Sequence, residues 1–339
     1  MPFTGVKECQ KGIHVHSWLT IERTGIIRQV PGNSRTNMAR ETEHQQPQPA
    51  PSVPCRSVPY RGRIAPTPSG WLHLGHASTF HTAWKRARES GGCILYRTED
   101  LDPFRCRPEY ASGAMEDLRW WGLDWDEGPD VEGEWGPYVQ SERMEGFREA
   151  FKRLVESGHI YESPHSRRQI REAEPIPSPV NGDPLFPPTL RQPVQTTIGN
   201  PQPDTIYRFR VPDGREVTFE DGRLRKQCFV AGQDFGDFII WKKDGCPAYE
   251  LAVVVDDHAM EISEVVRGED LLLATARQLL LYEALGWSPP AWYHCPLVKD
   301  PLTNHRMSKT RQSLALRTLR EAGHSPGQPP ESYFGQSKD

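Results

Sequence analysis

The stretch Arg63-Ile64-Ala65-Pro66-Thr67-Pro68-Ser69-Gly70-Trp71-Leu72-His73-Leu74-Gly75-His76 decides the fold that we expect for this chain. Residues 63–65 predict a short strand, and the Pro/Gly segment after them cannot be helical. His73 then begins an amphipathic run that continues through residues 77–89. A strand, a loop and a helix start in this order gather unpaired backbone N–H groups at the positive end of a helix dipole. The stretch therefore predicts a site for phosphate or carboxylate groups.

Two histidines and a glycine at this helix start indicate nucleotide chemistry. His73 and His76 are three residues apart, so they share one face and can both donate to phosphate oxygens. Gly75 has no side chain that would keep a flat nucleobase away. This motif alone also fits an ordinary loop. A second motif, Arg306-Met307-Ser308-Lys309, makes the pair more specific, because Lys309 could reach a polyphosphate as a mobile point charge.

The two motifs resemble the HIGH and KMSKS signatures of class I aminoacyl-tRNA synthetases, in particular the glutamyl branch. The resemblance extends from about residue 61 to residue 323 and includes four further stretches in the same order: residues 63–70, 96–102, 249–258 and 265–270. It implies an α/β fold with a Rossmann-like catalytic domain that is interrupted by a β-rich connective insertion. Such an enzyme is a ligase that activates glutamate with ATP.

The chain divides into five predicted segments. We expect a disordered N-terminal extension over residues 1–60, because this part shows no sustained helical or strand period and residues 45–59 are rich in Gln, Pro and Ser. The first half of the catalytic domain is expected over residues 61–162, and a Pro-rich loop with the connective insertion over residues 163–247. Residues 248–322 would form the second half of the catalytic domain with the KMSKS-like loop, and residues 323–339 a flexible tail.

Strand and helix patterns alternate in the two catalytic halves. We expect strands over residues 92–97, 249–257 and 294–298, helices over residues 109–122, 141–158 and 274–285, and a hairpin of residues 207–211 with 216–219. Alternation of this kind implies a parallel sheet, in which ligands bind at the carboxyl ends of the strands. Glu99 and the histidine turn both lie at such ends.

The resemblance also implies roles for individual residues. His73, His76 and Lys309 would be catalytic, with Lys309 holding the leaving pyrophosphate together with Mg²⁺. Arg63 and Arg267 would face the carboxylates of glutamate, Glu99 its ammonium group, and Thr67 and Tyr249 would donate hydroxyl groups, so that the charges balance. The ATP site would comprise Pro66, His73, Gly75, His76, Asp270, Arg306, Met307, Ser308 and Lys309. Seen alone, each of these residues also has a structural interpretation, such as a core tyrosine or a structural ion pair.

A zinc site is not expected. Many members of this branch carry a Cys-x-Cys pair directly after the helix that leads to the insertion, and here Ser163 and His165 stand at those positions. The sequence has no cysteine between Cys106 and Cys228, so a zinc ligand set cannot be assembled.

Composition limits the classes of protein that remain. The chain has 339 residues, of which 36% are hydrophobic and 25% charged, enough for a sizeable core. Seven scattered cysteines suggest no disulfide framework, and neither a long apolar run nor a signal-peptide pattern is present. We therefore expect a cytoplasmic protein without a membrane partner, and separately we expect a monomer. A net charge of -4 argues against a non-specific nucleic-acid coat, so RNA contacts would come from a local patch.

The acceptor is predicted from the segment after Lys309. Only 30 residues follow it, so we expect no anticodon-binding domain. Short paralogues with this truncation are the glutamyl-Q tRNA(Asp) synthetases, which attach glutamate to queuosine in the anticodon of tRNA(Asp), and the chain resembles them around residues 66–76. Two alternatives stay open: a truncated enzyme that charges tRNA(Glu), and a non-catalytic relic that binds RNA or a metabolite.

Overall fold

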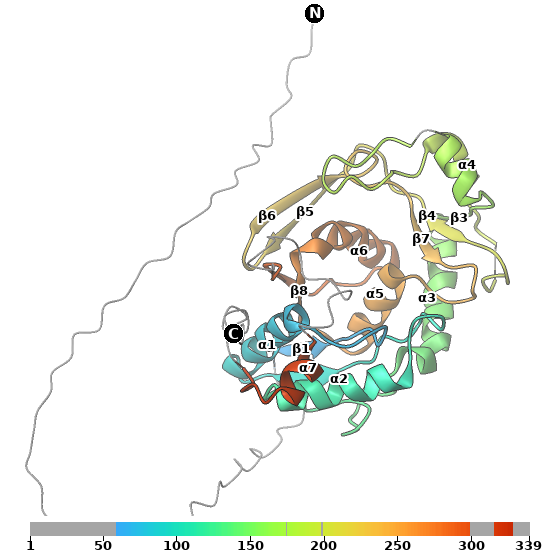
Figure 1. The fold of residues 1–339 in the computed structure, drawn as a ribbon. Helices are drawn as coiled ribbons and strands as arrows, with labels where there is room; N and C mark the ends of the chain where they lie inside the picture. The colour runs from blue at the N-terminus through green and yellow to red at the C-terminus, as the bar shows by residue number, and fades with distance from the viewer. Residues whose placement is uncertain (1–58, 174, 198, 299–314, 328–339) are drawn as a thin grey trace, which may run out of the picture. The chain divides into compact units, whose positions relative to one another are not determined.

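The computed structural model describes residues 59–173, 175–197, 199–298 and 315–327, which form a mixed α/β structure (Figure 1). The elements alternate as predicted in the first half and become β-rich in the middle. In chain order they are β1 (Arg61–Ile64), α1 (Leu74–Glu89), β2 (Cys93–Tyr96), α2 (Pro108–Trp120), η2 (Gln140–Arg143), α3 (Met144–Glu156), β3 (Ile160–Glu162), α4 (Arg167–Glu172), η3 (Pro188–Leu190), β4 (Tyr207–Phe209), β5 (Glu216–Asp221), β6 (Arg225–Val230), β7 (Phe238–Trp241), α5 (Tyr249–Ala259), β8 (Glu264–Gly268), η4 (Glu269–Leu271), α6 (Leu272–Leu285), β9 (Ala291–Cys295) and α7 (Leu316–Glu321).

Parallel strand pairs form the centre of the fold. β1 pairs with β2, with Arg61 opposite Cys93, and β8 pairs with β9, with Glu264 opposite Ala291. The Ser263 amide donates to the Arg61 carbonyl over 2.9 Å, which brings the start of β8 beside β1. The predicted parallel arrangement is confirmed, and the carboxyl ends of these strands meet at one edge.

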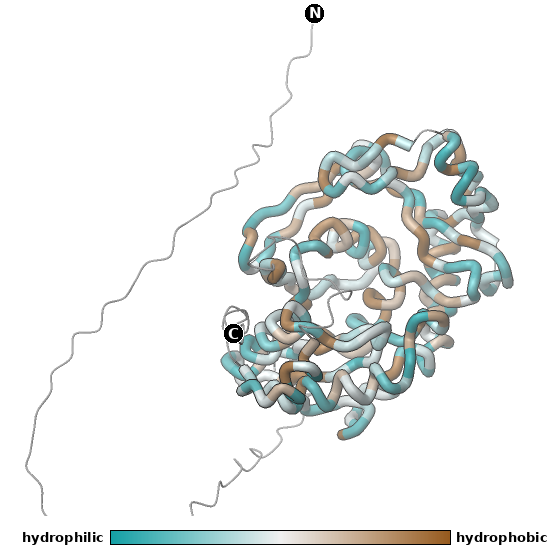
Figure 2. The backbone as a smooth tube through the Cα atoms, in the orientation of Figure 1, coloured by the Kyte–Doolittle hydropathy of each residue, from teal (hydrophilic) through white to brown (hydrophobic). Residues whose placement is uncertain are grey.

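Hydrophobic burial covers both sides of these strands. α1 buries Leu74, Ala77, Ala83 and Ala87 in the same cluster as Ile94 and Tyr96 of β2. α5 and α6 contribute to a second, larger cluster. Figure 2 shows hydrophobic residues recurring along α5 and α6, whereas the short helix α4 is mainly hydrophilic. Most of the burial therefore comes from the two catalytic halves predicted from the sequence.

One predicted strand is a helix. Residues 249–257 were expected to form a buried strand, but they form α5, in which every residue from Leu251 to Asp257 is buried. Because the apolar run is covered on all sides, it shows no helical periodicity, and three consecutive valines favour a strand by propensity. Tertiary packing overrides that propensity here.

The predicted hairpin pairing is also wrong. β4 pairs with β3 and β7, whereas β5 pairs with β6 in a hairpin that turns at Gly222. β5 also pairs in parallel with β9, with Asp221 opposite Trp292. A strand within the predicted insertion is thus hydrogen-bonded to a catalytic strand. The five segment boundaries themselves remain predictions.

The structure also bears on two expectations from the sequence, which concern the cysteines and membrane-spanning segments. In the described ranges, Cys106, Cys228, Cys246 and Cys295 are free thiols. None of the helices in the described ranges combines the length and the apolar character needed to cross a bilayer.

Candidate active site

A cavity of about 250 Å³ lies at the carboxyl ends of the parallel strands. Its walls come from the loop after β1, the segment after β2, the end of β8 and the segment after β9. All predicted site residues within the described ranges line it: Arg63, Pro66, Thr67, His73, Gly75, His76, Glu99, Tyr249, Arg267 and Asp270. The structure therefore brings these residues together, while their individual roles stay predictions.

The predicted histidine turn begins α1 with a capping box. His73 is the N-cap residue, and its Nδ1 accepts from the Gly75 amide over 3.1 Å. His76 Nδ1 accepts from the His73 amide over 3.2 Å, and the two rings lie 3.8 Å apart. Because a backbone N–H donates to each Nδ1, the proton of each neutral imidazole lies on Nε2. Both rings are thus held as Nε2–H donors, which is the form that suits a phosphate oxygen.

The ring of His73 leaves no space for a side chain at position 75, so this residue has to be glycine. A Cβ at this position would lie 2.9 Å from Cε1 and 3.1 Å from Nδ1 of His73. The sequence explained this glycine by an approaching nucleobase. The structure adds that a side chain here would displace the capping imidazole, so Gly75 and His73 act as one unit.

Two residues that line the cavity, Arg63 and Glu99, belong to a buried network of charges around Arg97. Arg97 is fully buried and donates to Asp257 Oδ1 over 2.8 Å and to Glu99 Oε1 over 3.1 Å. Its Nε lies 3.8 Å from Asp256 Oδ2. Arg63 joins the network through Asp257 Oδ1 at 3.4 Å and donates to the Val266 carbonyl over 3.0 Å. Two predicted ligand-binding residues, Arg63 and Glu99, are thus held by the same buried arginine–aspartate pair.

Burial sets the protonation behaviour of Glu99. Loss of hydration raises the pKa of its carboxyl, and the nearby Arg97 and Arg63 guanidinium groups partly oppose this rise. An arriving ammonium group would favour the charged form further. Glu99 is therefore suited to receive a cation.

Arg267 occupies the floor of the cavity with its guanidinium group held on three sides. NH2 donates to Thr275 Oγ1 over 2.7 Å, NH1 to Tyr249 Oη over 3.3 Å, and Nε to His294 Nε2 over 3.3 Å. The group also lies over the Trp292 ring at 4.9 Å. Arg267 is 4% exposed and Tyr249 39% exposed, so this hydrogen bond joins the buried arginine to a residue that solvent reaches.

The sequence missed the residues that support these side chains. Arg97, Asp256 and Asp257 stand within stretches that carried the resemblance, yet their roles were not predicted. His294 and Asp221 are separated by 73 positions along the chain, and nothing in the sequence pattern links them. Arg97, two positions before Glu99 at the end of an expected buried strand, was the one available signal for the network.

Several predictions fall outside the described ranges. Arg306, Met307, Ser308 and Lys309 all lie in the segment 299–314, so their placement in the site stays a prediction.

At the position where related enzymes carry zinc-binding cysteines, Ser163 is buried and accepts a hydrogen bond from Arg208 over 3.1 Å. In the described part of the chain, no group of three His, Cys, Asp or Glu side chains is arranged to hold a metal. The absence of zinc remains a prediction.

Comparison with known families identifies this architecture. Residues 59–331 match the model of the class I tRNA synthetases (E and Q), catalytic domain, and this match covers the whole cavity. The chain belongs to the class I tRNA synthetases. The predicted enzyme class, a ligase of the aminoacyl-tRNA synthetase type, is therefore confirmed, as is the Rossmann-like catalytic fold.

Two proteins named glutamyl-Q tRNA(Asp) synthetase are similar to this synthetase over most of their length. The one from Nitratidesulfovibrio vulgaris is 46% identical over 266 residues, which cover 78% of this chain and 82% of that protein. The one from Symbiobacterium thermophilum is 45% identical with the same coverage. The resemblance to this group that the sequence suggested is confirmed.

Longer synthetases match over about half of their length. A glutamate–tRNA ligase of Symbiobacterium thermophilum is 38% identical, and the match covers 55% of that protein. Among solved structures, the glutamate-tRNA synthetase from Elizabethkingia anophelis superposes with a TM-score of 0.65 at 30% identity, covering 78% of this chain and 54% of that one. The shared part is the catalytic domain that contains the cavity.

Proposed function

We propose that this synthetase activates L-glutamate with ATP and transfers the glutamyl group to queuosine in the anticodon of tRNA(Asp). The observation that carries the proposal is the charge pattern of the cavity, in which two buried arginines and one buried glutamate face the same space. A free glutamate has two carboxylates and one ammonium group. Each of these charges is costly to bury without a partner, and the cavity offers one partner for each.

The amino-acid end of the cavity would bind glutamate in one orientation. Arg63 and Arg267 would bind carboxylates and Glu99 the ammonium group, while the Tyr249 hydroxyl lies within hydrogen-bond distance of Arg267 and lines the same cavity. Thr67 would donate a further hydroxyl. Positioning of this kind supplies most of the catalysis, because the substrate carboxylate itself attacks the α-phosphorus and pyrophosphate leaves.

The histidine turn would bind ATP. The Nε2–H groups of His73 and His76 can donate to phosphate oxygens, and Gly75 leaves room beside the ring of His73. Lys309 and Arg306, placed by the sequence motif alone, would neutralise the leaving pyrophosphate together with Mg²⁺. Mg²⁺ usually combines one or two carboxylates with substrate phosphates, and Asp270 is the carboxylate among the described cavity residues besides Glu99, which is assigned to the ammonium group.

The acceptor is inferred from the two relatives that match over 82% of their length, both named for tRNA(Asp). A hydroxyl group of queuosine would attack the carbonyl carbon of the adenylate and release AMP. The anticodon loop presents unpaired bases, which proteins recognise by stacking and by contacts to base edges. The reaction would take place in the cytoplasm, where tRNA is abundant.

Two measurements test the proposal in sequence. The first is glutamate-dependent ATP–pyrophosphate exchange, in which the wild type should be active and Lys309→Ala should lose about a hundredfold or more, because a phosphate-binding charge is removed. The second is mass analysis of the anticodon nucleoside of tRNA(Asp) after incubation with the enzyme, which should gain one glutamyl group.

Charging of tRNA(Glu) is the comparison that separates the alternatives. Transfer to tRNA(Glu) and none to queuosine-containing tRNA(Asp) would contradict the proposed acceptor and leave the activation step intact. A wild type without pyrophosphate exchange would instead favour a relic that binds RNA or a metabolite.

A further inference from the structure

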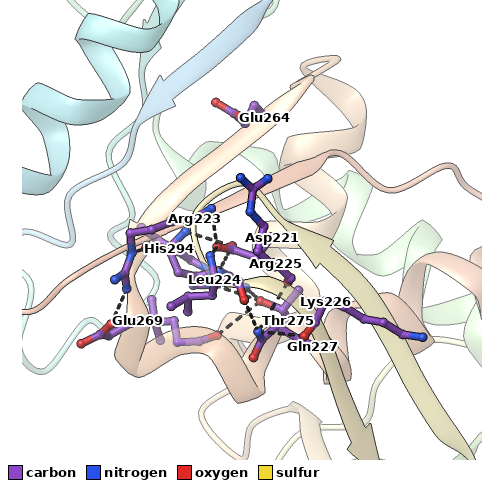
Figure 3. Close-up of polar contacts among 12 residues, drawn as sticks. Asp221, Arg223, Leu224, Arg225, Lys226, Gln227, Glu264, Glu269, Thr275 and His294 are labelled. Carbon is purple, nitrogen blue, oxygen red and sulfur yellow. Dashed lines mark hydrogen bonds and ion pairs between the residues drawn. The ribbon is translucent and has the colours of Figure 1, made fainter. Parts of the chain in front are cut away.

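A buried aspartate links the β5–β6 hairpin to the floor of the cavity. Asp221 ends β5 and is 2% exposed. Its Oδ1 accepts the amides of Arg223 at 3.0 Å and Leu224 at 2.7 Å. Its Oδ2 accepts both the backbone amide of His294 at 3.0 Å and the ring Nδ1 at 2.7 Å. Figure 3 shows Asp221 between the residues of the turn and His294. Four donors on one carboxylate leave it little freedom to reorient.

This contact determines the tautomer of His294. A carboxylate can only accept, so Nδ1 of the imidazole must carry the hydrogen and Nε2 must be the acceptor. Nε2 lies 3.3 Å from Arg267 Nε and 3.1 Å from Thr275 Oγ1, both of which can donate to it. The Thr275 hydroxyl in turn accepts from Arg267 NH2 over 2.7 Å. The hydrogen bonds thus have one consistent direction, from Arg267 through His294 to Asp221.

The electrostatic surroundings keep His294 neutral. Burial and the neighbouring Arg267 charge lower its pKa to about 4, against the opposing effect of Asp221. Burial alone would raise the pKa of Asp221, but the hydrogen bonds from the Leu224 amide and the His294 ring lower it overall. A neutral imidazole beside an ionised carboxylate is the state that the distances require.

A second contact from the same turn reaches the cavity edge. The Arg223 side chain donates to the His294 carbonyl and forms an ion pair with Glu269, which follows β8 directly. The turn itself is closed by Gln227, whose Nε2 donates to the Leu224 carbonyl over 2.8 Å. One turn therefore contacts the ends of both β8 and β9, which carry the cavity floor.

We propose that Asp221, His294 and Thr275 are positioning residues that hold the Arg267 guanidinium group in the orientation required to bind a substrate carboxylate. The β5–β6 hairpin is then a component of the amino-acid site, although the sequence assigned it to the insertion. This inference rests on the proposed use of glutamate. None of the three residues lines the cavity, so each acts through Arg267 and has no direct contact with substrate.

The role of these residues predicts a selective kinetic effect. A guanidinium group that loses one partner can rotate, and it must be reordered when the carboxylate binds, which weakens glutamate binding. The histidine turn, where we propose that ATP binds, is held by its own backbone amides, so ATP binding should not depend on this network. A change in the network should therefore raise KM for glutamate and leave KM for ATP nearly unchanged.

Asp221→Asn is the first test. The asparagine amide keeps the shape of the side chain but replaces one acceptor oxygen by an NH₂ donor. Both oxygens of Asp221 accept from N–H groups, so in either orientation this NH₂ group would face other donors. We expect KM for glutamate in pyrophosphate exchange to rise about tenfold, as for the loss of one buried hydrogen bond, with KM for ATP changed less than twofold. Glu220→Gln is the matched control, because it removes the same charge from the adjacent, exposed position. It should resemble the wild type.

Thr275→Val is the second test and does not depend on the folding of the Asp221 variant. Valine has nearly the shape of threonine, so packing in α6 is kept while Arg267 loses its closest acceptor. KM for glutamate should again rise about tenfold, and Thr275→Ser, which restores a hydroxyl, should reverse most of the rise. If Thr275→Val raises KM for glutamate and KM for ATP by similar factors and also lowers the melting temperature, the role of Thr275 is structural and the proposal is overturned.

A spectroscopic measurement distinguishes this inference from the proposed function. In ¹⁵N-histidine-labelled protein, the imidazole signal that disappears in His294→Gln should show a proton on Nδ1 in the wild type and a changed pattern in Asp221→Asn. Wild-type exchange with unchanged glutamate KM in both variants, or a proton on Nε2 of His294, would overturn the inference alone. A wild type that neither binds glutamate in calorimetry nor catalyses exchange would overturn the proposed function, and the inference with it.

Discussion

The two ends of the cavity are built in different ways. At the histidine turn, His73 and His76 bond to backbone amides no more than three residues away, and both side chains are partly exposed. At the arginine end, Arg97 and Asp257 are buried and 160 positions apart, and Arg267 is fixed by residues from three elements. The turn is a local structure, whereas the arginine end exists only when the whole sheet has formed.

The two ends of the cavity therefore differ in the free energy that their formation costs. The turn satisfies its own backbone groups at the helix start, so it needs little support from the rest of the chain. The arginine end places several charges out of water, and each is tolerable only because its partners are present. Mutations at the arginine end should therefore affect both folding and glutamate binding, whereas mutations at the turn should affect ATP binding.

Arg97→Met should give the largest effect. The change leaves Glu99, Asp256 and Asp257 without their shared cation, and the free energy of unfolding should fall by about 3–5 kcal/mol, measured by urea denaturation. Arg105→Met is the matched control, because its ion pair with Asp102 is largely exposed and should contribute less than about 1 kcal/mol. Equal losses in the two variants would contradict the distinction between buried and exposed pairs.

Glu99→Gln should affect binding more than stability. The variant keeps the side-chain volume but removes the charge that we assign to the substrate ammonium group. KM for glutamate should rise about a hundredfold, because a buried charge pair loses one partner. The measurement is pyrophosphate exchange over a range of glutamate concentrations, and an unaltered KM would remove Glu99 from the proposed site.

His294 should produce a pH dependence of stability. Its folded pKa of about 4 lies below the ordinary value of 6.5, so the unfolded chain binds a proton that the folded chain refuses between these values. The free energy of unfolding should therefore fall as pH decreases from about 6.5 to about 4, by about 1.4 kcal/mol per pH unit at most. His294→Gln should lack this component, and parallel curves for the two proteins would contradict it.

Gly75→Ala should give the smallest of these effects. The new methyl group would meet the His73 ring at 2.9 Å and displace the imidazole from its capping position. KM for ATP should rise about tenfold, equivalent to the loss of one cap, while KM for glutamate stays within twofold. Gly146→Ala in α3 is the control: its methyl group would lie 4.0 Å from Val255, and the substitution should stabilise the helix by about 0.5–1 kcal/mol.

The local turn could be predicted from the sequence, and the long-range network could not. The Pro/Gly loop and the spacing of His73 and His76 specify a helix start by chemistry that acts within a few residues. The sequence also identified Arg63, Glu99 and Arg267 through a family resemblance, and the structure places all three around one cavity. The partners that hold them, Asp257 and His294, depend on which strands lie side by side.

The errors in the fold have the same origin. α5 was predicted as a strand because Leu251 to Val255 is a continuous apolar run, and such a run has no period when all sides are buried. The partner of β5 was misassigned because the Asp221-Gly222 pair, where β5 ends and the turn begins, was not recognised as the turn signal. A correct assignment of that turn would have placed Asp221 at the end of β5.

The fixed guanidinium group of Arg267 has a consequence for discrimination between amino acids. Three of its five N–H donors are engaged by Tyr249, Thr275 and His294, so the group has little freedom to follow a ligand of different length. Aspartate, one methylene shorter, could not satisfy Arg63, Glu99 and Arg267 at once, and an unmatched buried charge is heavily penalised. Glutamine would present an N–H₂ group to a cation. Both should be rejected at the activation step, without a separate site to hydrolyse wrong products.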